Sequence, residues 1–401
     1  MGGDIGANTL NGDVDASASL YITWCWDDKM EIPVWRAERR PHGLATMQTG
    51  QAASEPPRSL LAPATFWVCA AAVTGALLVL RRPDAVFHAQ FWAEDGVAWY
   101  ADSYNLGALR ALLQARDGYL AIFPRLVAAA AQSVPLVRAP LLFNFIALMI
   151  EALPPLFLVS TRMRNIGPLN LRCGLALLYL LVPDSSEVHA NITNSQWQLD
   201  VLACLILIAQ VPRSRWGRAF DVIVLAICAL STLTGALLLA VALARTTGPL
   251  LFRRWTHAPA SGSETRWSWV QASVLAACAL VQELALLSAG ATRLKSALGA
   301  SADKFARIVA GQIVLPVFLG RNRLYDISRD PSIITPVAFV ITIVTGLIVF
   351  YALLRGTTEL RCFIFFAGLV LLAALTFPNV QPVAHQWDLF LWPGAALLVY
   401  P

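Results

Sequence analysis

The feature that most constrains this chain is the recurrence of apolar runs of roughly 17–25 residues, each long enough to cross a bilayer core of about 30 Å as a helix. Only 14% of the residues are charged and 57% are hydrophobic, whereas a soluble domain carries roughly 25% charged residues. The pattern predicts an all-α fold, a polytopic transmembrane helical bundle of about ten spans joined by helical outer loops.

The expected spans follow from hydropathy alone, and they lie at 63–80, 139–160, 169–183, 197–211, 219–233, 235–251, 269–290, 332–354, 361–377 and 388–400. The two runs between 219 and 251 are separated by residues 232–235 only, so their division into two helices is itself a prediction. A further apolar stretch at 119–137 contains Pro124 and Pro135, which favours an interfacial or re-entrant helix over a span.

The two ends of the chain differ from this pattern. Residues 1–60 are polar and aperiodic, which predicts a disordered cytoplasmic tail or a gene start placed too early. Residues 61–401 form the expected membrane domain. Because the sequence stops inside an apolar run, at Tyr400 and Pro401, we expect this domain to be truncated at its C-terminal end.

The basic residues predict the orientation, because loops rich in Arg and Lys stay on the cytoplasmic side. One set of loops is rich in arginine, and its members are Arg162, Arg164, Arg172, Arg213, Arg215, Arg218, Arg253, Arg254, Arg266, Arg355 and Arg361. The opposite loops, near 184–196 and 378–387, carry almost no basic residues, although the arginine pair at 81–82 is an exception. The pattern predicts a multi-pass membrane protein whose long loops, 83–138 and 291–331, lie on the outer side of the membrane, which is the periplasm for a protein of a bacterial inner membrane. No basic patch supports a nucleic-acid partner.

The first long loop presents two adjacent carboxylates, Glu94 and Asp95, among aromatic residues. Two carboxylates at a membrane surface can abstract a proton or bind a divalent cation such as Mg²⁺ or Mn²⁺. Partial burial between aromatic rings would raise a carboxyl pKa toward the range of a useful base. The alternative interpretation is an ordinary solvated acidic turn, and the residues alone leave both open.

The next outer loop gathers acids, amides and an indole, and its candidate residues are Asp184, Glu187, Asn191, Asn194 and Trp197. Such a set suits sugar recognition, because amides and carboxylates bond hydroxyl groups and an indole covers the apolar face of a sugar ring. The alternative is that these residues cap helices, as Asp, Ser and Asn often do.

Further ionic residues complete the candidates. Arg321 and Arg323 are suited to grip a phosphate in a bidentate manner, with a solvated loop or phospholipid headgroup contacts as the alternative. Four acids fall within or near spans, namely Glu151, Asp200, Asp221 and Glu283. Charges inside a membrane are costly and point to function, above all to transport.

Taken in order, these motifs resemble those of the GT-C type membrane glycosyltransferases, whose relatives include oligosaccharyltransferases, protein mannosyltransferases and lipid A aminoarabinose transferases. Members carry an acidic pair in the first outer loop, where Glu94 and Asp95 stand here, and often a second acidic motif in the next loop, where Asp184 and Glu187 fall. The bacterial pattern W-x-E-D-G, G-Y-L, P-R-L and A-N-I-T-N-x-x-W is matched by segments 92–96, 118–120, 124–126 and 190–197. The likeness covers roughly residues 65–400.

The resemblance implies hexosyl transfer on the periplasmic face, from a polyprenyl-phosphate-linked sugar to a glycan, lipid or other acceptor, with inversion or retention left open. Glu94 or Asp95 would be the general base, and Arg321 or Arg323 would stabilise the departing phosphate. Asn194 and Trp197 would position sugar or acceptor. A metal, Mg²⁺ or Mn²⁺ on Glu94 and Asp95, is undecided, because some relatives use one and others do not. The chain departs from the family in lacking a substantial C-terminal soluble domain.

Two other hypotheses remain open on the sequence. A transporter or flippase for a polyprenyl-linked glycan would have Glu151 and Glu283 facing a cavity. A non-catalytic scaffold or degenerate fragment would fit the abrupt end of the chain. The sequence contains no nucleotide-binding Walker loop, so ATP hydrolysis by this chain is not expected.

Overall fold

The computed structural model describes residues 61–116, 118–182, 188–251, 262–288, 302–315, 317–319 and 331–376. The chain divides into two units, Met1–Arg58 and Ser59–Pro401, and all described residues belong to the second. The expected tail at 1–60 and the expected last span at 388–400 lie outside the described residues. Every regular element within the described ranges is a helix, which confirms the all-α class for that part of the chain.

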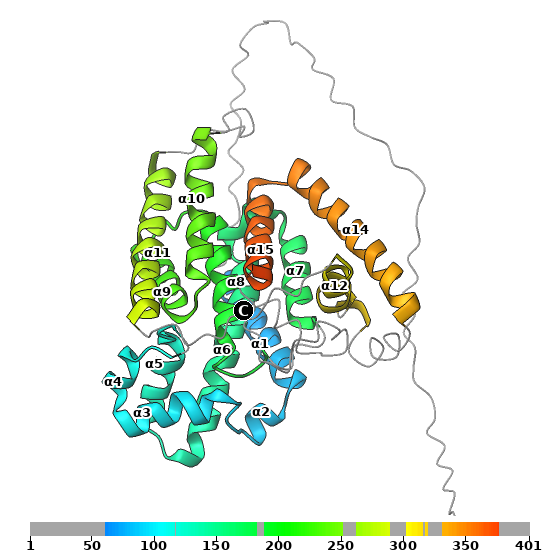
Figure 1. Cartoon of the computed structure of the whole chain (residues 1–401). Helices are drawn as coiled ribbons and strands as arrows, with labels where there is room; N and C mark the ends of the chain where they lie inside the picture. Colours follow the sequence, from blue (N-terminus) through cyan, green and yellow to red (C-terminus); the bar gives the residue numbers. More distant parts are fainter. Residues whose placement is uncertain are drawn as a thin grey trace, which may run out of the picture. The chain divides into compact units, whose positions relative to one another are not determined.

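Four of the described helices are long and apolar enough to cross a membrane: α1 (Leu61–Arg81), α6 (Ala139–Val159), α11 (Gly262–Ser288) and α14 (Pro331–Arg355). The bundle also contains α7 (Leu169–Leu181), α8 (Ser195–Ile208), α9 (Arg215–Ser231), α10 (Gly235–Leu251) and α15 (Thr358–Thr376) (Figure 1). These four helices support the prediction of a membrane protein. With 13 and 14 residues, α7 and α8 fall short of the roughly 20 that a crossing helix needs. Ten spans are therefore not confirmed.

The predicted division of the apolar stretch 219–251 into two helices is correct. Helix α9 ends at Ser231 and α10 begins at Gly235, so the turn is tight. A side chain at Gly235 would place its Cβ 2.8 Å from the Cβ of Ala229, which explains why glycine stands at this close approach. The turn is tied to α8, because Thr234 donates a hydrogen bond to Asp200 at 2.6 Å.

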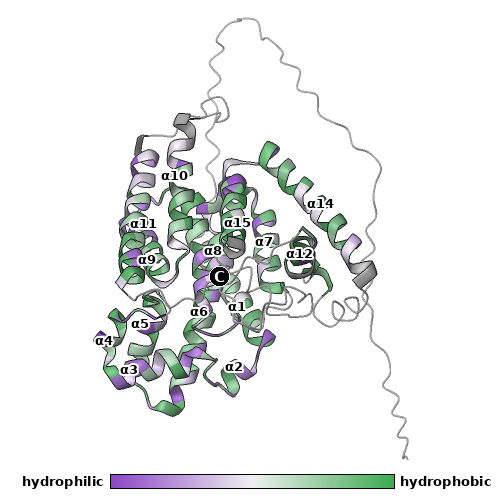
Figure 2. Ribbon diagram, in the orientation of Figure 1, coloured by the Kyte–Doolittle hydropathy of each residue, from purple (hydrophilic) through white to green (hydrophobic). Residues whose placement is uncertain are grey.

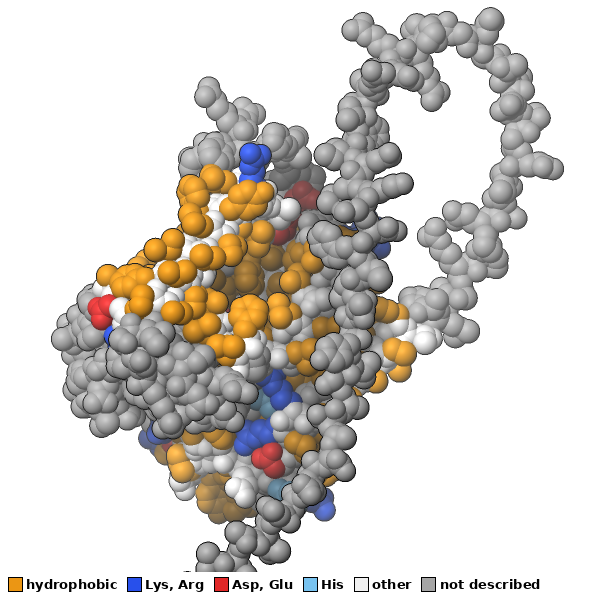
Figure 3. Space-filling view, turned by 90° about the vertical axis from the view of Figure 1, so that its right-hand side faces the viewer, with side chains coloured by type: hydrophobic (Ala, Val, Ile, Leu, Met, Phe, Trp, Pro, Cys, Tyr) orange, Lys and Arg blue, Asp and Glu red, His pale blue; other side chains and the backbone are white. Residues whose placement is uncertain are grey.

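The core of the bundle is α8, in which residues 202–208 are all buried and which packs against α6, α9, α10 and α15. A helix that is apolar on all sides is expected in the interior of a bundle. Helix α14 is the opposite case, with large apolar side chains exposed along its length, including Val340, Ile343, Leu347, Ile348 and Tyr351. Figure 2 shows α14 as largely hydrophobic, and Figure 3 shows hydrophobic side chains spread over that side of the molecule. Apolar surface of this extent fits contact with lipid.

Arginine side chains cap the C-terminal ends of several helices, where the last carbonyl groups lack hydrogen-bond partners within the helix. Arg172 donates to the last carbonyl of α6 at 3.0 Å, and Arg245 donates to the carbonyl that follows α8 at 3.2 Å. Arg81 donates to the carbonyl of Leu180 near the end of α7 at 3.0 Å. This bond gives Arg81 a structural role on a side of the bundle where the charge pattern predicts few basic residues.

Short helices fill the segment between α1 and α6, here called the first loop (residues 82–138). They are α2 (Asp84–Phe87), η1 (Asp95–Tyr100), α3 (Ala101–Leu106), α4 (Ala108–Leu113), α5 (Ile122–Ala131) and η2 (Leu136–Arg138). Helices α2 to α5 gather at one end of the bundle (Figure 1). With 10 residues α5 is too short to span a membrane, as the sequence predicts. The remaining short elements are η3 (Thr161–Ile166), α12 (Ala302–Ile308) and η4 (Val309–Val314).

Candidate functional site

The carboxylate of Asp95 joins the two loops that the sequence singles out. The second loop lies between α7 and α8, and its described residues are 182 and 188–194. Asp95 is fully buried at the start of η1 and accepts hydrogen bonds from the backbone N–H of Ile192 at 3.1 Å and of Thr193 at 2.8 Å. The Thr193 hydroxyl donates a third bond at 2.7 Å. Asp95 therefore fixes the second loop against η1.

The backbone around this carboxylate is shaped by close packing. Ala93 has a φ of 31°, which is unusual for a residue with a side chain, and the N–H of Asp95 donates to the carbonyl of Trp92 at 2.7 Å. A Cβ at Gly96 would lie 3.1 Å from that of Phe91, so glycine lets this ring approach. The turn aims Asp95 inward, whereas the neighbouring Glu94 side chain is exposed.

Burial raises the pKa of Asp95 from its usual 3.8 to about 6. The hydrogen bonds from Thr193 and Ile192 favour the charged form and oppose this shift, while the nearby charge of Glu94 adds to it. The two adjacent acids thus differ in exposure and hydrogen bonding. Glu94 lies where a substrate can reach it, whereas Asp95 is buried and accepts hydrogen bonds from three donors.

Stability should depend on pH through Asp95 in a defined direction. Between the unfolded pKa of 3.8 and the folded pKa of about 6, the folded protein keeps a proton that the unfolded chain has lost. The stabilising contribution of Asp95 is therefore full below pH 3.8 and is lost as the pH rises through about 6, by on the order of 3 kcal/mol. Between about pH 4 and 7, we expect the free energy of unfolding of the wild-type protein to fall by this amount relative to that of Asp95→Asn. Unfolding experiments in detergent measure the difference. Equal pH dependence in the two proteins would contradict the assignment.

The second loop is shaped by its own amides. The side-chain oxygen of Asn191 accepts the backbone N–H of Asn194 at 2.8 Å, and the backbone carbonyl of Asn191 accepts the Ser195 hydroxyl at 2.8 Å. Asn191 is buried, whereas Asn194 and Trp197 are partly exposed around the start of α8. The side chain of Asn191 thus shapes the turn that precedes α8, and Asn194 and Trp197 lie near the surface. Four other candidates, Asp184, Glu187, Arg321 and Arg323, lie outside the described residues.

The second loop is also anchored to α1 and α6, by residues to which sequence reasoning gives no such role. His189 is buried, and its Nδ1 lies 2.8 Å from Oε1 of Glu151 on α6. The backbone N–H of Ala190 donates to the other oxygen of Glu151 at 3.4 Å. Arg82, just after α1, donates to the carbonyl of His189 at 3.3 Å. The position of Glu151 within an apolar run is the one sequence signal that points to this anchor.

The other acids near the spans have varied surroundings. Asp221 forms a bidentate pair with Arg162, at 2.6 and 2.8 Å, and Asp200 accepts hydrogen bonds from Thr234 and from Cys228. Glu283 is exposed on α11. The transport hypothesis expects Glu151 and Glu283 to face one cavity, but Glu151 is buried against His189 while Glu283 lies at the surface. These positions do not favour transport over transfer.

A cluster of cationic and aromatic side chains lies beside the Asp95 junction. The indole Nε1 of Trp99 on η1 donates to the hydroxyl of Thr193 at 3.0 Å. Arg125 on α5 lies 5.3 Å from the Trp99 ring centre, and Arg116 lies 6.0 Å from it. Both arginines approach one carboxylate oxygen of Asp102, at 3.4 and 3.7 Å. Sequence reasoning missed Trp99, Arg116 and Asp102, because nothing in the sequence shows that they share one place.

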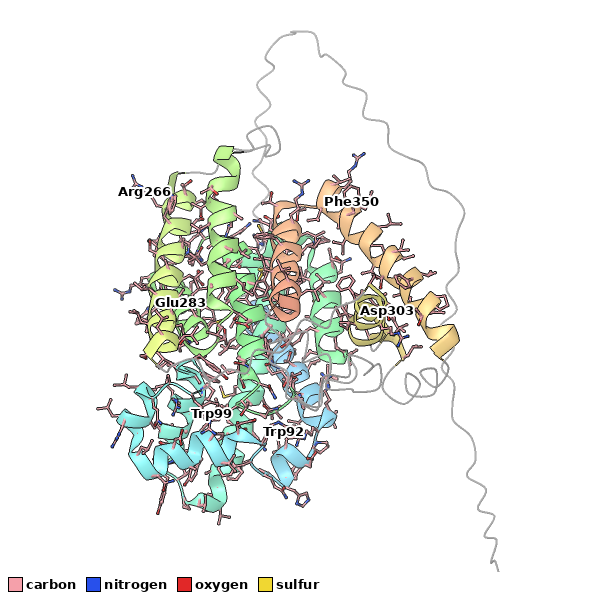
Figure 4. The ribbon with its side chains drawn as sticks, in the orientation of Figure 1. Trp92, Trp99, Arg266, Glu283, Asp303 and Phe350 are labelled. Atoms are coloured by element: carbon pink, nitrogen blue, oxygen red, sulfur yellow. The ribbon has the colours of Figure 1, made fainter. Side chains whose placement is uncertain are left out.

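The arrangement brings together the four motif segments 92–96, 118–120, 124–126 and 190–197. Asp95 contacts Thr193, Trp99 contacts Thr193 and Arg125, and the Nε of Arg125 donates to the carbonyl of Leu120 at 3.1 Å. In Figure 4, Trp92 and Trp99 lie at the end of the bundle that carries α2 to α5, and Arg266 lies at the opposite end. This end of the bundle therefore holds three carboxylates, two indoles and at least two guanidinium groups, namely those of Glu94, Asp95, Asp102, Trp92, Trp99, Arg116 and Arg125.

Metal ligation at this region has little support within the described ranges. No group of three or more His, Cys, Asp or Glu side chains that could hold an ion occurs there. Both oxygens of Asp95 already accept hydrogen bonds, two on Oδ1 and one on Oδ2. A Mg²⁺ or Mn²⁺ ion on Glu94 and Asp95 would compete with the hydrogen bonds by which Asp95 holds the second loop.

In comparisons with known proteins, no family model, no curated protein and no solved structure matches this chain.

Proposed function

We propose that this chain is a membrane glycosyltransferase that moves a hexosyl group from a polyprenyl-phosphate donor to a glycan, lipid or other acceptor. Transfer takes place at the periplasmic face of a bacterial inner membrane, within a bundle of the GT-C type. The supporting observation is the convergence of the four motif segments, through Asp95, Thr193, Trp99 and Arg125, at one end of the bundle. A lipid-carried sugar needs a site at the membrane surface, and the short helices α2 to α5 gather at one end of the long apolar helices (Figure 1).

Glu94 is the catalytic base in this proposal. It removes the proton from an acceptor hydroxyl as the bond from the acceptor oxygen to the anomeric carbon forms. The bond from that carbon to the phosphate oxygen breaks, and polyprenyl phosphate leaves with the electron pair. The sugar passes through an oxocarbenium-like transition state. A positioned base accelerates such a step by roughly 10²–10⁴-fold.

Asp95 has a positioning role, because it is buried and its oxygens hold the second loop. By holding Ile192 and Thr193 it fixes the loop that leads to Asn194 and Trp197, whose amide and indole would bind sugar hydroxyls and a sugar ring face. Asn191 shapes the turn that presents them. Asp184 and Glu187, and the phosphate-binding candidates Arg321 and Arg323, keep the roles that the family resemblance implies.

The proposal is tested with the purified full chain in nanodiscs. Undecaprenyl-phosphate glucose and undecaprenyl-phosphate mannose are supplied with a lipid and glycan extract of bacterial envelopes, without nucleotide. The expected result is release of undecaprenyl phosphate together with a sugar-bearing product, both detected by mass spectrometry. Movement of donor across a liposome bilayer without release would support the flippase instead. An impermeant thiol reagent that reaches Glu94→Cys only from the cytosolic side would also contradict the proposal.

A further inference from the structure

The buried ring of His189 in the second loop faces an acceptor at each of its two nitrogens. Its Nδ1 lies 2.8 Å from Oε1 of Glu151, and its Nε2 lies 3.1 Å from the carbonyl oxygen of Leu78. A neutral imidazole has one nitrogen that donates and one that accepts, so it satisfies one of these oxygens and sets a lone pair against the other. A ring that carries a proton on both nitrogens donates to both oxygens. The arrangement therefore requires one proton more than a neutral ring beside a carboxylate holds.

The surroundings place this proton on the ring, so that a positive His189 pairs with a negative Glu151. The second oxygen of Glu151 accepts the N–H of Ala190 at 3.4 Å, and Arg81 is close enough to Glu151 for their charges to interact. Both contacts stabilise a carboxylate. The carbonyl of Leu78 belongs to the last turn of α1, and the C-terminal end of a helix favours a cation.

Further ionisable groups lie around the pair. Those among the described residues are Arg82 just after α1, Asp84 on α2, Tyr179 on α7 and Asp95 on η1. Arg82 donates to the carbonyl of His189 and also pairs with Asp84. Asp95 holds the loop farther along, and its pKa of about 6 means that its charge changes in the same pH range as that of a histidine. A test of the His189 proton must therefore separate the two groups.

We propose that the proton on Nδ1 of His189 is a pH-sensitive latch: it holds the second loop on α1 and α6 while it is present and releases the loop when it is lost. Loss sends the proton to water and leaves lone pairs of Nδ1 and of Glu151 facing each other in a buried place. Ala190, beside the latch, has a φ of 54°, which is unfavourable for a residue with a Cβ and favours relaxation of the released loop. The loop leads to Asn194 and Trp197, so the proton determines whether these side chains are held. The inference rests on the contacts of His189 and does not depend on sugar transfer.

The test follows the ring and the loop together in the purified full chain in nanodiscs, from about pH 5 to about pH 9. NMR of ¹⁵N-labelled histidine reports the protons on the His189 ring, whose signals are identified by their absence from His189→Asn. Hydrogen exchange, corrected for the intrinsic rate at each pH, reports the protection of backbone amides 190–193. We expect this protection to fall about 10- to 100-fold over the pH interval in which the ring loses its proton, as for loss of a hydrogen bond to a charged group.

Two variants, each checked for folding by thermal unfolding, make opposite predictions at high pH. In Glu151→Gln the amide N–H donates to an unprotonated Nδ1 and the amide oxygen accepts the N–H of Ala190, so a neutral ring satisfies every contact and the loop stays protected. His189→Asn keeps a donor for Glu151 but loses the one for Leu78, so protection should be low at every pH, without the wild-type step. The contribution of Asp95 is common to all three proteins and cancels in their comparison.

Three results would overturn the proposal. The first is a ring that becomes neutral while the wild-type amides stay protected. The second is a loss of protection in Glu151→Gln at high pH as large as that of the wild type. The third applies if the wild-type ring keeps both protons up to about pH 9, and it is equal protection of the two variants at that pH. Sugar transfer enters none of these measurements, so their outcome is independent of the proposed function.

Discussion

Replacement of Glu94 by glutamine is expected to lower hexosyl transfer roughly 10²–10⁴-fold while the protein remains folded. The amide cannot take up the acceptor proton, but it preserves the size of an exposed side chain that makes no described tertiary bond. Initial rates of undecaprenyl phosphate release in nanodiscs measure the effect, and binding of the donor should change little.

Glu283→Gln is the matched control for this variant, because it makes the same change at an exposed glutamate of α11. It should retain the wild-type rate. Transfer at full rate by Glu94→Gln would remove Glu94 from the mechanism, and an equal loss in Glu283→Gln would mean that the measured loss is not specific to the first loop.

Replacement of Asp95 by alanine is expected to damage both stability and transfer. Two backbone N–H groups and the Thr193 hydroxyl would lose their acceptor, and each buried unsatisfied group costs about 1–3 kcal/mol. Near neutral pH the variant no longer buries a charged carboxylate, and this gain offsets part of the lost stability. The net loss is on the order of 2–5 kcal/mol, which corresponds to a drop in Tm of roughly 2–6 °C at an unfolding entropy of about 2.1 cal/mol/K per residue. Thermal unfolding in detergent measures it.

The control for this variant is Asp84→Ala, at an exposed carboxylate of α2 whose contact with Arg82 is a surface ion pair at 3.3 Å. Its expected cost is below about 1 kcal/mol. Together the two acidic positions separate the roles: Glu94→Gln loses transfer alone, whereas Asp95→Ala loses transfer and stability together. If Asp95→Ala unfolds at the wild-type temperature, the hydrogen bonds from Asp95 to the second loop do not stabilise the site.

Much of the helical framework is predictable from the sequence. The expected spans 63–80, 139–160 and 332–354 agree closely with α1, α6 and α14, and the four-residue division at 232–235 matches the end of α9 and the start of α10. The reason is that a helix in lipid satisfies its own backbone, so its limits depend on the local run of apolar residues. The number of spans was less predictable, because the apolar runs at 169–183 and 197–211 form helices of only 13 and 14 residues.

By itself the sequence determined the all-helical class of the described residues, the positions of the long apolar helices and the choice of Glu94 and Asp95 as residues of interest. Only the tertiary structure decided that Asp95 faces inward to Ile192, a residue 97 positions away, while Glu94 faces out. The same holds for Arg125, Arg116 and Trp99, which come from different helices and loops. Hydropathy is a property of neighbours along the chain, but burial, charge pairing and pKa depend on which distant segments pack together.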